Sequence, residues 1–353
     1  MNKGLWIATG IVFGMSVVVV LGIAILSGVF QSSSNYFLRR YPPHPIVEKD
    51  TVDIRVDSYY VAGGTIHNAY LGNSTVPLHL MRIGLRRLGA EAIEVSINGI
   101  EHERFWSIKV KVDSPFVFLA DGTLPKIYRG ALAGGSAQEL EVSKTFFLDY
   151  EPTSPNNIAI KYLGYPTKEN MLGSLALNTD DILTKSGILE KQVDGVFCTD
   201  GSMCYDNTTG NFIYTYRYRN EFIVMDTSLN VKYRGRTIDT TSVAKIKVVP
   251  IGVNSTTFGS PPLIVNRTAV ASNGLLFIQS NLLAENDARD ALQAASIIDV
   301  YGVRDGKYRF SFYVPDYRGA KMRSFGVFGN TFVAVLGRHL QTFELSSNAF
   351  ELH

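Results

Sequence analysis

The chain has 353 residues, enough for one large repeat domain or two ordinary domains. With 34 basic and 32 acidic residues its net charge is only +2, and the basic residues are scattered, so nothing in the charge points to nucleic acid as a partner. Aromatic residues make up 11% of the chain, including 18 Tyr and 20 Phe, and this composition favours strands over helices.

Residues 5–30 contain no charged residue. About 20 apolar residues span the hydrocarbon layer of a bilayer, so this stretch is long enough. The apolar region of a signal peptide is shorter, roughly 7–15 residues, and no clear small-x-small cleavage site follows. We therefore predict an uncleaved transmembrane signal anchor over residues 1–34, with a cleaved signal peptide as the alternative.

The flanking charges give two readings of orientation. Arg39 and Arg40, set against Lys3, would place the large domain in the cytoplasm by simple counting. A short basic N-terminus before an apolar run is, however, the usual form of an export signal. We expect a single-pass protein of the cytoplasmic (inner) membrane, attached through residues 5–30, with its large domain extracytoplasmic (periplasmic).

The anchor is followed by a Ser/Asn stretch and then by "RRYPPHP". Pro42, Pro43 and Pro45 favour extended polyproline geometry. This composition predicts a stiff, Pro-containing linker over residues 35–51.

From residue 52 onward the period-2 pattern of strands dominates. Between residues 202 and 237 four short strands alternate with polar turns: "SMCYD", "NFIYTYRYR", "EFIVMDT" and "VKYRGRT". This pattern predicts an up-down meander of one four-stranded antiparallel sheet. Similar units recur over 59–84, 108–132, 274–319 and 321–345, and the Ala- and acid-rich stretch 282–296 is expected as a helical or loop insertion.

Two local patterns also repeat. F-x-x-D-G-[ST]-[LM] occurs at 118–124 and 197–203, and Tyr-Arg-Gly occurs at 128–130, 233–235 and 317–319. The Tyr-Arg-Gly copies are 105 and 84 residues apart, and half of each distance is a plausible length for one propeller blade.

A single four-stranded blade cannot bury both faces of its sheet, whereas blades stacked in a closed ring can. The 294 residues from 52 to 345 would make about six blades. We predict an all-β fold: an about six-bladed β-propeller of four-stranded antiparallel blades over 52–348, preceded by one N-terminal transmembrane helix. A pair of β-sandwiches is the alternative.

The segments "ASIIDVYGVRDGKYRFSFYV" and "KMRSFGVFGNTFVAVLGRHLQTFEL" resemble blades of TolB-like and NHL-like six-bladed propellers. Over residues 52–345 the chain resembles bacterial membrane-anchored propellers of this kind. The resemblance implies the fold. It implies no single activity, because those families include scaffolds, sensors and a few lyases or hydrolases.

The only cysteines, Cys198 and Cys204, are separated by five residues in "CTDGSMC", which is neither a zinc-ligand nor a thioredoxin spacing. A hairpin turning at Asp200-Gly201 would place Cys198 opposite Met203, so the thiols would not face each other. We expect buried or free thiols, and a disulfide stays open for an oxidising compartment.

The sequence contains no nucleophile elbow, zinc-protease motif, phosphate-binding loop, calcium loop or dinucleotide fingerprint. It therefore predicts no catalytic residue, cofactor or metal ligand, and it does not decide whether the chain is an enzyme.

The arginines form a candidate binding site. If Tyr-Arg-Gly closes the fourth strand of each blade, its arginines are equivalent and lie on the face of the loop between strands two and three. Guanidinium groups suit carboxylates and phosphates. The alternative is structural, with each arginine paired to a nearby acid such as Asp226, Asp239 or Asp316, or stacked on Tyr. The six candidates are Arg129, Arg217, Arg219, Arg234, Arg236 and Arg318.

We expect a non-enzymatic binding or scaffold module for a protein, peptide or anionic ligand. One alternative is a lyase or hydrolase with its site in the propeller channel, and a second is a redox-associated propeller.

Overall fold

The computed structural model of the protein describes residues 12–17, 36–87, 89–97, 105, 107–140, 145–179, 181–252 and 255–350. The chain divides into two compact units, Met1–Tyr36 and Phe37–His353. Residues 12–17 are helical, and most of the predicted anchor, residues 5–30, lies outside the described residues. No helix in the described ranges has the length and apolar character needed to cross a membrane.

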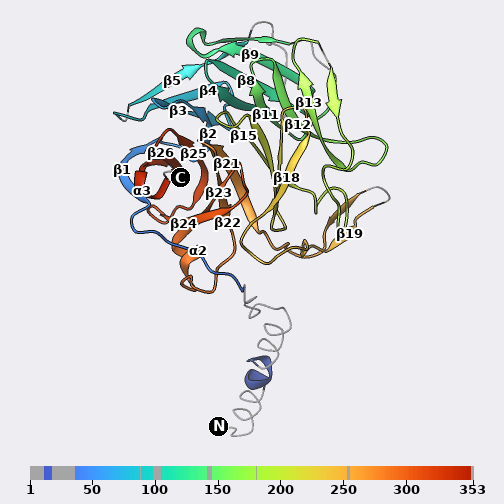
Figure 1. The fold of residues 1–353 in the computed structure, drawn as a ribbon, viewed down its shortest axis with the longest axis vertical. Helices are drawn as coiled ribbons and strands as arrows, with labels where there is room; N and C mark the ends of the chain where they lie inside the picture. Colours follow the sequence, from blue (N-terminus) through green and yellow to red (C-terminus); the bar gives the residue numbers. More distant parts are fainter. Residues whose placement is uncertain are drawn as a thin grey trace, which may run out of the picture. The chain divides into compact units, whose positions relative to one another are not determined.

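The second unit is built from strands that follow one another around a ring (Figure 1). Its described residues form six four-stranded antiparallel blades, of which the first two are joined into one larger sheet by a single parallel bridge between β2 and β7. The strands of the first three blades are β2 (Tyr59–Gly64), β3 (Asn68–Asn73), β4 (His79–Gly84), β5 (Ala90–Glu94); β7 (Lys109–Asp113), β8 (Phe116–Asp121), β9 (Lys126–Ala131), β10 (Ser136–Glu139); and β11 (Asp149–Ser154), β12 (Asn157–Leu163), β13 (Asn170–Ala176), β14 (Ile182–Thr184).

The last three blades have the same order. Their strands are β15 (Gly201–Asp206), β16 (Asn211–Tyr216), β17 (Glu221–Met225), β18 (Val231–Arg236); β21 (Asn266–Ser272), β22 (Leu275–Ser280), β23 (Ala295–Gly302), β24 (Tyr308–Pro315); and β25 (Met322–Phe328), β26 (Thr331–Leu336), β27 (His339–Leu345), β1 (Ile46–Asp53). Short elements lie between them: β6 (Ser96–Ile97), the 3₁₀ turn Leu132–Gly134, the hairpin β19 (Val248–Pro250) and β20 (Thr256–Phe258), α2 (Ala291–Ala294) and α3 (Ser347–Phe350).

The last blade closes the ring with both ends of the chain. β1 pairs antiparallel with β27, from Ile46 opposite Leu345 to Asp53 opposite His339, and Figure 1 shows the blue strand β1 beside the red strands of this blade. Each inner strand also contacts the inner strand of the next blade, including β25 with β2. The fold is therefore a β-propeller closed by pairing of its N- and C-terminal strands.

This closure corrects the predicted domain boundaries. The prediction placed a spacer over residues 35–51, but Ile46–Asp53 is a strand and Phe37 already belongs to the compact unit of the propeller. The reason is topological: β25–β27 supply only three strands, and the N-terminal segment supplies the fourth.

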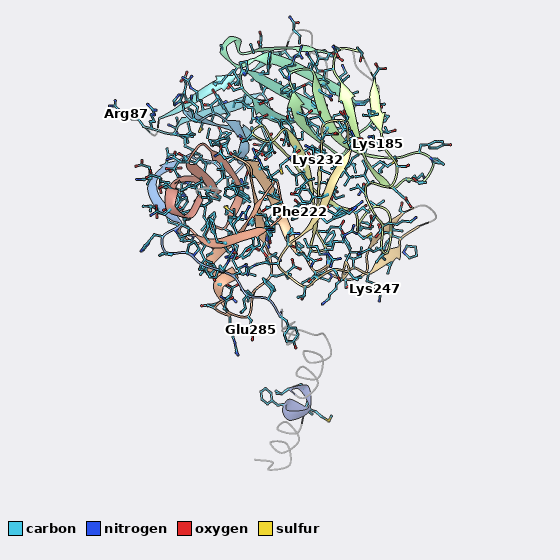
Figure 2. All side chains as sticks on the ribbon, viewed as in Figure 1. Arg87, Lys185, Phe222, Lys232, Lys247 and Glu285 are labelled. Carbon is cyan, nitrogen blue, oxygen red and sulfur yellow. The ribbon has the colours of Figure 1, made fainter. Side chains whose placement is uncertain are left out.

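The core of the ring lies between neighbouring sheets. β16 is buried along its whole length, and Phe222 on β17 packs with Leu276 on β22 of the next blade. In Figure 2 Phe222 lies inside the fold, whereas Arg87 and Lys247 lie at its periphery. Because each sheet is covered on both faces, apolar residues follow one another along the middle strands, and burial of each large side chain contributes about 1.5–3 kcal/mol.

Several predicted elements are confirmed. The four strands predicted between 202 and 237 are β15–β18, the insertion predicted at 282–296 lies between β22 and β23 and contains α2, and the length-based expectation of about six blades agrees with the blades described. The repeat that supported this expectation is not a blade repeat, however. Tyr-Arg-Gly falls in a third strand (β9), in a fourth strand (β18) and after a fourth strand (β24).

Candidate functional site

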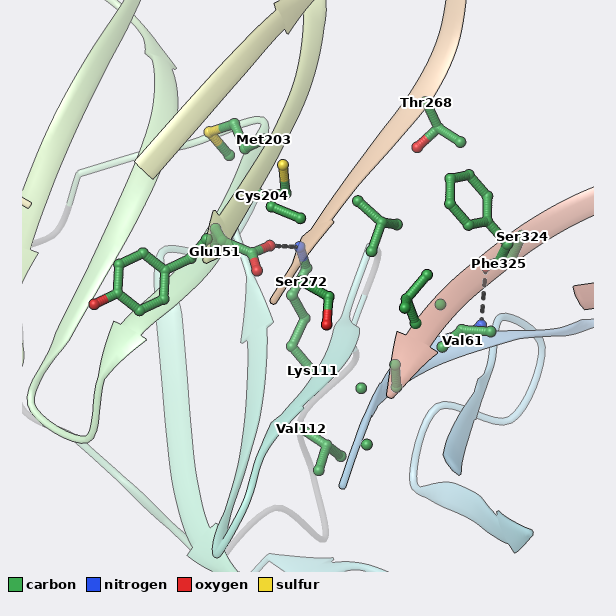
Figure 3. Close-up of a pocket in the computed structure, with 18 of the residues that line it drawn as sticks. Val61, Lys111, Val112, Glu151, Met203, Cys204, Thr268, Ser272, Ser324 and Phe325 are labelled. Atoms are coloured by element: carbon green, nitrogen blue, oxygen red, sulfur yellow. Dashed lines mark hydrogen bonds and ion pairs between the residues drawn. The ribbon is translucent and has the colours of Figure 1, made fainter. Parts of the chain in front are cut away.

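The six inner strands, β2, β7, β11, β15, β21 and β25, surround a central channel with a volume of about 770 Å³ (Figure 3). The lining includes consecutive residues of the inner strands, such as residues 60–64 of β2 and 202–206 of β15, because the inner edge of each sheet borders the channel. Small-molecule sites usually measure roughly 300–1,000 Å³, and the channel lies within this range.

Two ion pairs connect neighbouring blades inside the channel. Lys109 and Lys111 alternate along β7, and Asp149 and Glu151 alternate along β11. The Lys109 Nζ lies 3.0 Å from Asp149 Oδ1, and Lys111 forms an ion pair with Glu151, drawn in Figure 3. The side chains of Lys111 and Glu151 remain 24% and 19% exposed, so a ligand in the channel can reach both.

The ionisation of these groups follows from their surroundings. Burial alone would lower the pKa of Lys111, but Glu151 and Asp149 more than offset it and hold that pKa above its ordinary value. Burial raises the pKa of Glu151 although Lys111 opposes the change. Burial alone would raise the pKa of Asp149, but Lys111 and Lys109 together hold that pKa below its ordinary value. The channel lining thus holds two cations, Lys109 and Lys111, and three carboxyl groups, Asp149, Glu151 and the buried Asp206, and this balance favours a neutral polar or zwitterionic ligand over an anion.

The rest of the channel wall mixes apolar and hydrogen-bonding groups. Half-buried apolar residues of the lining include Val61, Val270 and Phe328, whereas Val112 and Phe325 border the channel but are almost fully buried between blades (Figure 3). Ser324 Oγ accepts a hydrogen bond of 3.0 Å from the Val61 backbone N–H, which ties β25 to β2. Asn207, in the turn after β15, also lines the cavity. Such a wall can bury the apolar part of a ligand and bind its polar groups.

Cys204 lies on β15 in the channel wall, and both it and Cys198 are buried and free. Burial raises the pKa of Cys204 well above its ordinary value. The hairpin predicted at Asp200-Gly201 is wrong, because Gly201 begins β15 and the chain reverses only after Asp206. Turn residues such as Asp-Gly also occur where a loop enters a strand, so this dipeptide did not mark the hairpin.

The predicted arginine face is not formed. Arg129 lies on the third strand of its blade and contacts the carbonyl of Pro155 and, at 2.7 Å, Asn156 Oδ1, both in the turn between a first and a second strand. Arg234 lies on a fourth strand, and Arg318 lies in the connection after one. In an antiparallel blade the first-to-second turn and the exit of the fourth strand are at opposite ends, so Arg129 lies on the face opposite the other two.

The remaining arginines of the fourth blade are held by acids. Arg217 Nε lies 2.8 Å from Asp200 Oδ2. Arg219 is 1% exposed, and its guanidinium lies 3.6 Å from the centre of the Tyr216 ring.

Glu221 joins two arginines of this blade: its carboxylate lies 3.2 Å from Arg219 and 2.8 Å from Arg234. Glu190 lies 3.0 Å from Arg234, and Arg236 is exposed at the end of β18. These arginines therefore form the ion pairs that the structural alternative predicted. Their partners are acids other than the examples Asp226, Asp239 and Asp316 given from the sequence.

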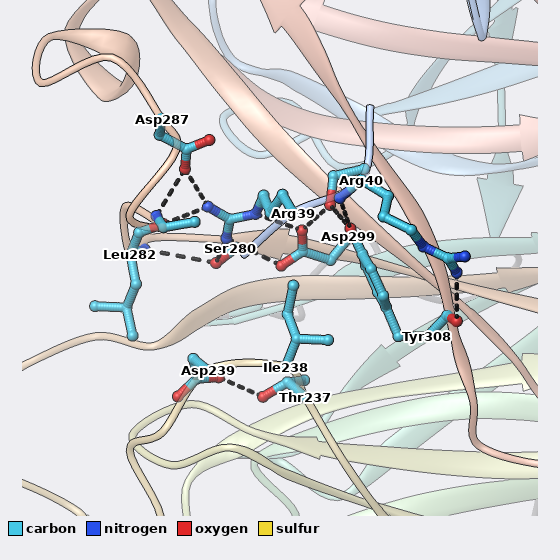
Figure 4. Close-up of polar contacts among 12 residues, drawn as sticks. Arg39, Arg40, Thr237, Ile238, Asp239, Ser280, Leu282, Asp287, Asp299 and Tyr308 are labelled. Carbon is cyan, nitrogen blue, oxygen red and sulfur yellow. Dashed lines mark hydrogen bonds and ion pairs between the residues drawn. The ribbon is translucent and has the colours of Figure 1, made fainter. Parts of the chain in front are cut away.

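Arg39, in the segment predicted as a linker, is buried against the fifth blade (Figure 4). Its Nε donates to Asp299 Oδ1 at 2.7 Å, and its Nη1 donates to the Leu282 carbonyl at 3.0 Å and forms an ion pair with Asp287. Its Nη2 donates to Ser280 Oγ at 2.9 Å. Sequence reasoning used this residue only as a topology signal and missed its structural role.

The channel ion pairs were also missed, although the sequence carries a signal for them. "KVKV" and "DYE" place like charges at every second position of a strand, hence on one face of the sheet. Opposite charges on two such strands, in a ring where first strands face the axis, indicate a charged channel.

No protein-family model and no curated protein matches the sequence. Among solved structures, a member of the DUF4221 family from Bacteroides vulgatus is similar over 85% of this chain and 97% of that one, with a TM-score of 0.55 and 10% identity. A chain of a nidogen/laminin complex matches over 73% and 80% of the two chains (TM-score 0.44, 9% identity), and the computationally designed protein Ika8 over 83% and 98% (TM-score 0.43, 8% identity).

At 10% identity the similarity to the DUF4221 structure concerns the fold alone. The narrower likeness to TolB-like and NHL-like propellers finds no support among these structures and stays a resemblance.

Proposed function

We propose that the chain is a non-enzymatic β-propeller binding module that takes a neutral polar or zwitterionic ligand, such as a short peptide, into its central channel. The observation that supports this most is the partly exposed Lys111–Glu151 ion pair inside a cavity of about 770 Å³ lined by all six inner strands.

The chemistry of the channel suits a peptide with free termini. A ligand carboxylate can bind Lys111 while a ligand ammonium group binds Glu151. Lys111 and Glu151 would then each replace their mutual ion pair with an ion pair to the ligand. Charge-assisted hydrogen bonds of this kind contribute about 1.5–3 kcal/mol each. The half-buried apolar residues of the wall, among them Val61, Val270 and Phe328, can contact the ligand's side chains.

The location of the module belongs to the same proposal. The uncharged stretch over residues 5–30 would hold it at the inner membrane with the propeller in the periplasm, and its partner would be a protein or peptide there. Arg39 follows this stretch closely in sequence and is buried in the propeller, so the anchor would be joined to the domain by only a few residues.

The test uses residues 37–353 and a panel of di- to tetrapeptides, each with free and with blocked termini, measured by calorimetry and thermal shift. Peptides with free termini should raise the melting temperature, since a ligand at 100 times its Kd stabilises by about 2.7 kcal/mol. Lys111→Met and Glu151→Gln should each weaken binding by about tenfold or more.

Arg82→Met is the matched control, because Arg82 forms an ion pair with Glu91 on outer strands, away from the channel. The proposal fails if no peptide stabilises the domain, or if Arg82→Met weakens binding as much as the channel variants do. Cleavage of a bound peptide would favour the hydrolase alternative instead.

A further inference from the structure

A second cleft lies at one end of the last blade, where three connections meet. The chain passes from β1 to β2 through residues 54–58, from β24 to β25 through 316–321, and from β26 to β27 through 337–338. They enclose a cleft of about 770 Å³ whose charged and polar lining is made by Asp53, Arg55, Asp57, Arg318, Arg338 and His339. None of its lining residues lines the central channel, so the two sites are separate.

The backbone at two of these arginines is unusual. Arg55 has φ 72° and Arg318 has φ 51°, both in the left-handed region. Residues other than Gly, Asn and Asp rarely adopt this conformation, because Cβ crowds the neighbouring carbonyl. Strained residues of this kind cluster at binding sites, and here two of them line the same cleft.

Three arginines and two carboxylates, Asp53 and Asp57, line the cleft, so arginine is in excess by one charge. Arg338 is held by Asp53, with Nη2 2.6 Å from Oδ2. Neither Arg55 nor Arg318 forms an ion pair with any other residue in the ranges that the structure describes, although the Arg318 guanidinium lies 5.3 Å from the centre of the Tyr317 ring. The positive surroundings also affect Asp53. Its carboxyl group is exposed, but the hydrogen bond from Arg338 and, second, the hydrogen bond from the Arg55 backbone N–H lower its pKa to about 2.

We propose that this cleft binds a phosphate group, with Arg55 and Arg318 as its two direct ligands and Arg338, oriented by Asp53, beside them. The planar fork of a guanidinium matches the oxygens of phosphate, and several guanidiniums around one cleft suit a group that carries up to two negative charges. In this proposal Arg318 binds an anion, which is the role that the sequence analysis considered for it, but its partners come from other turns than those predicted.

The test measures binding of inorganic phosphate to residues 37–353 by calorimetry and phosphorus NMR line broadening, with chloride replaced at constant ionic strength so that screening does not change. Arg55→Gly and Arg318→Gly remove the charge and also relieve the left-handed backbone, so the variants should keep their melting temperature or raise it. Each should weaken phosphate binding by about tenfold or more.

Lys168→Gly is the matched control, because Lys168 is also exposed, basic and left-handed, with φ 56°, but lies in the connection between β12 and β13. It should bind phosphate within about twofold of the unmodified domain. The proposal is overturned if the unmodified domain shows no saturable phosphate binding, or if Lys168→Gly loses as much affinity as the two cleft variants.

Discussion

Replacing Arg39 with Met should destabilise the propeller by much more than replacing its neighbour Arg40. The Arg39 guanidinium is held by two carboxylates, Asp287 and Asp299, and its side chain is fully buried. Burial alone would lower its pKa, but Asp299 and then Asp287 keep that pKa above its ordinary value, so the residue stays charged. Met fills much of the same volume but leaves both carboxylates without their cation.

The magnitude follows from the loss of one partner in a buried ion pair, which costs about 3–5 kcal/mol because a buried charge is left uncompensated. Asp299 is itself 3% exposed and would keep only its hydrogen bond of 2.5 Å from Ser311 Oγ. For a domain of this size the loss corresponds to a fall in Tm of roughly 5–8 °C. Arg40 is exposed and its guanidinium donates only to backbone carbonyls, so Arg40→Met should cost less than about 1 kcal/mol.

The assay is denaturant unfolding of residues 37–353, with Arg40→Met as the matched control. Combining Arg39→Met with Asp299→Asn should recover part of the loss, because the uncompensated charge is then removed. Equal unfolding free energies for Arg39→Met and Arg40→Met would refute the reasoning, since they would mean that the segment before β1 does not stabilise the ring.

Two further predictions concern acid stability and the anchor. Burial raises the pKa of Asp200, but Lys161 and Arg217 bring it below its ordinary value, so its contribution to stability is present above about pH 3.9 and is lost as the pH falls toward the folded-state pKa. Asp200→Asn should therefore flatten the fall in unfolding free energy between about pH 5 and pH 3, and parallel curves for the two proteins would contradict this. If residues 5–30 span the membrane uncleaved, carbonate washing should leave the full chain in the membrane and release residues 37–353, and a reporter after His353 should be extracytoplasmic. A mature N-terminus near residue 32, or a cytoplasmic reporter, would count against the anchor or its orientation.

The sequence predicted the elements whose signals are local. β15–β18 could be placed because alternation within each strand and the polar turns between them lie within one short stretch. The local patterns Tyr-Arg-Gly and Asp-Gly led to wrong predictions because they are also local signals. They mark turns and strand ends, which occur at both ends of every blade, so they do not indicate a position in the ring.

Features that depend on distant pairing were not predictable in the same way. β1 is an outer strand with charged residues along it, so "IVEKDTVD" shows little apolar alternation, and its partner β27 lies at the other end of the chain. The third blade, β11–β14, was not assigned from the sequence at all. The cleft around Arg55 and Arg318 needs three turns from three parts of the chain, and neither backbone conformation is encoded by a Gly or Asn at that position.

Closure of the ring by two strands far apart in the sequence has a consequence for synthesis. Gln341 on β27 bonds to Glu48 on β1 across 293 residues of sequence. At roughly 5–20 residues per second, about 15–60 seconds would pass between the appearance of the first strand and that of its partner. During that interval β1 has free backbone donors and acceptors that can pair with another nascent chain. We expect the first strand made to be the part of the nascent chain that most needs a chaperone.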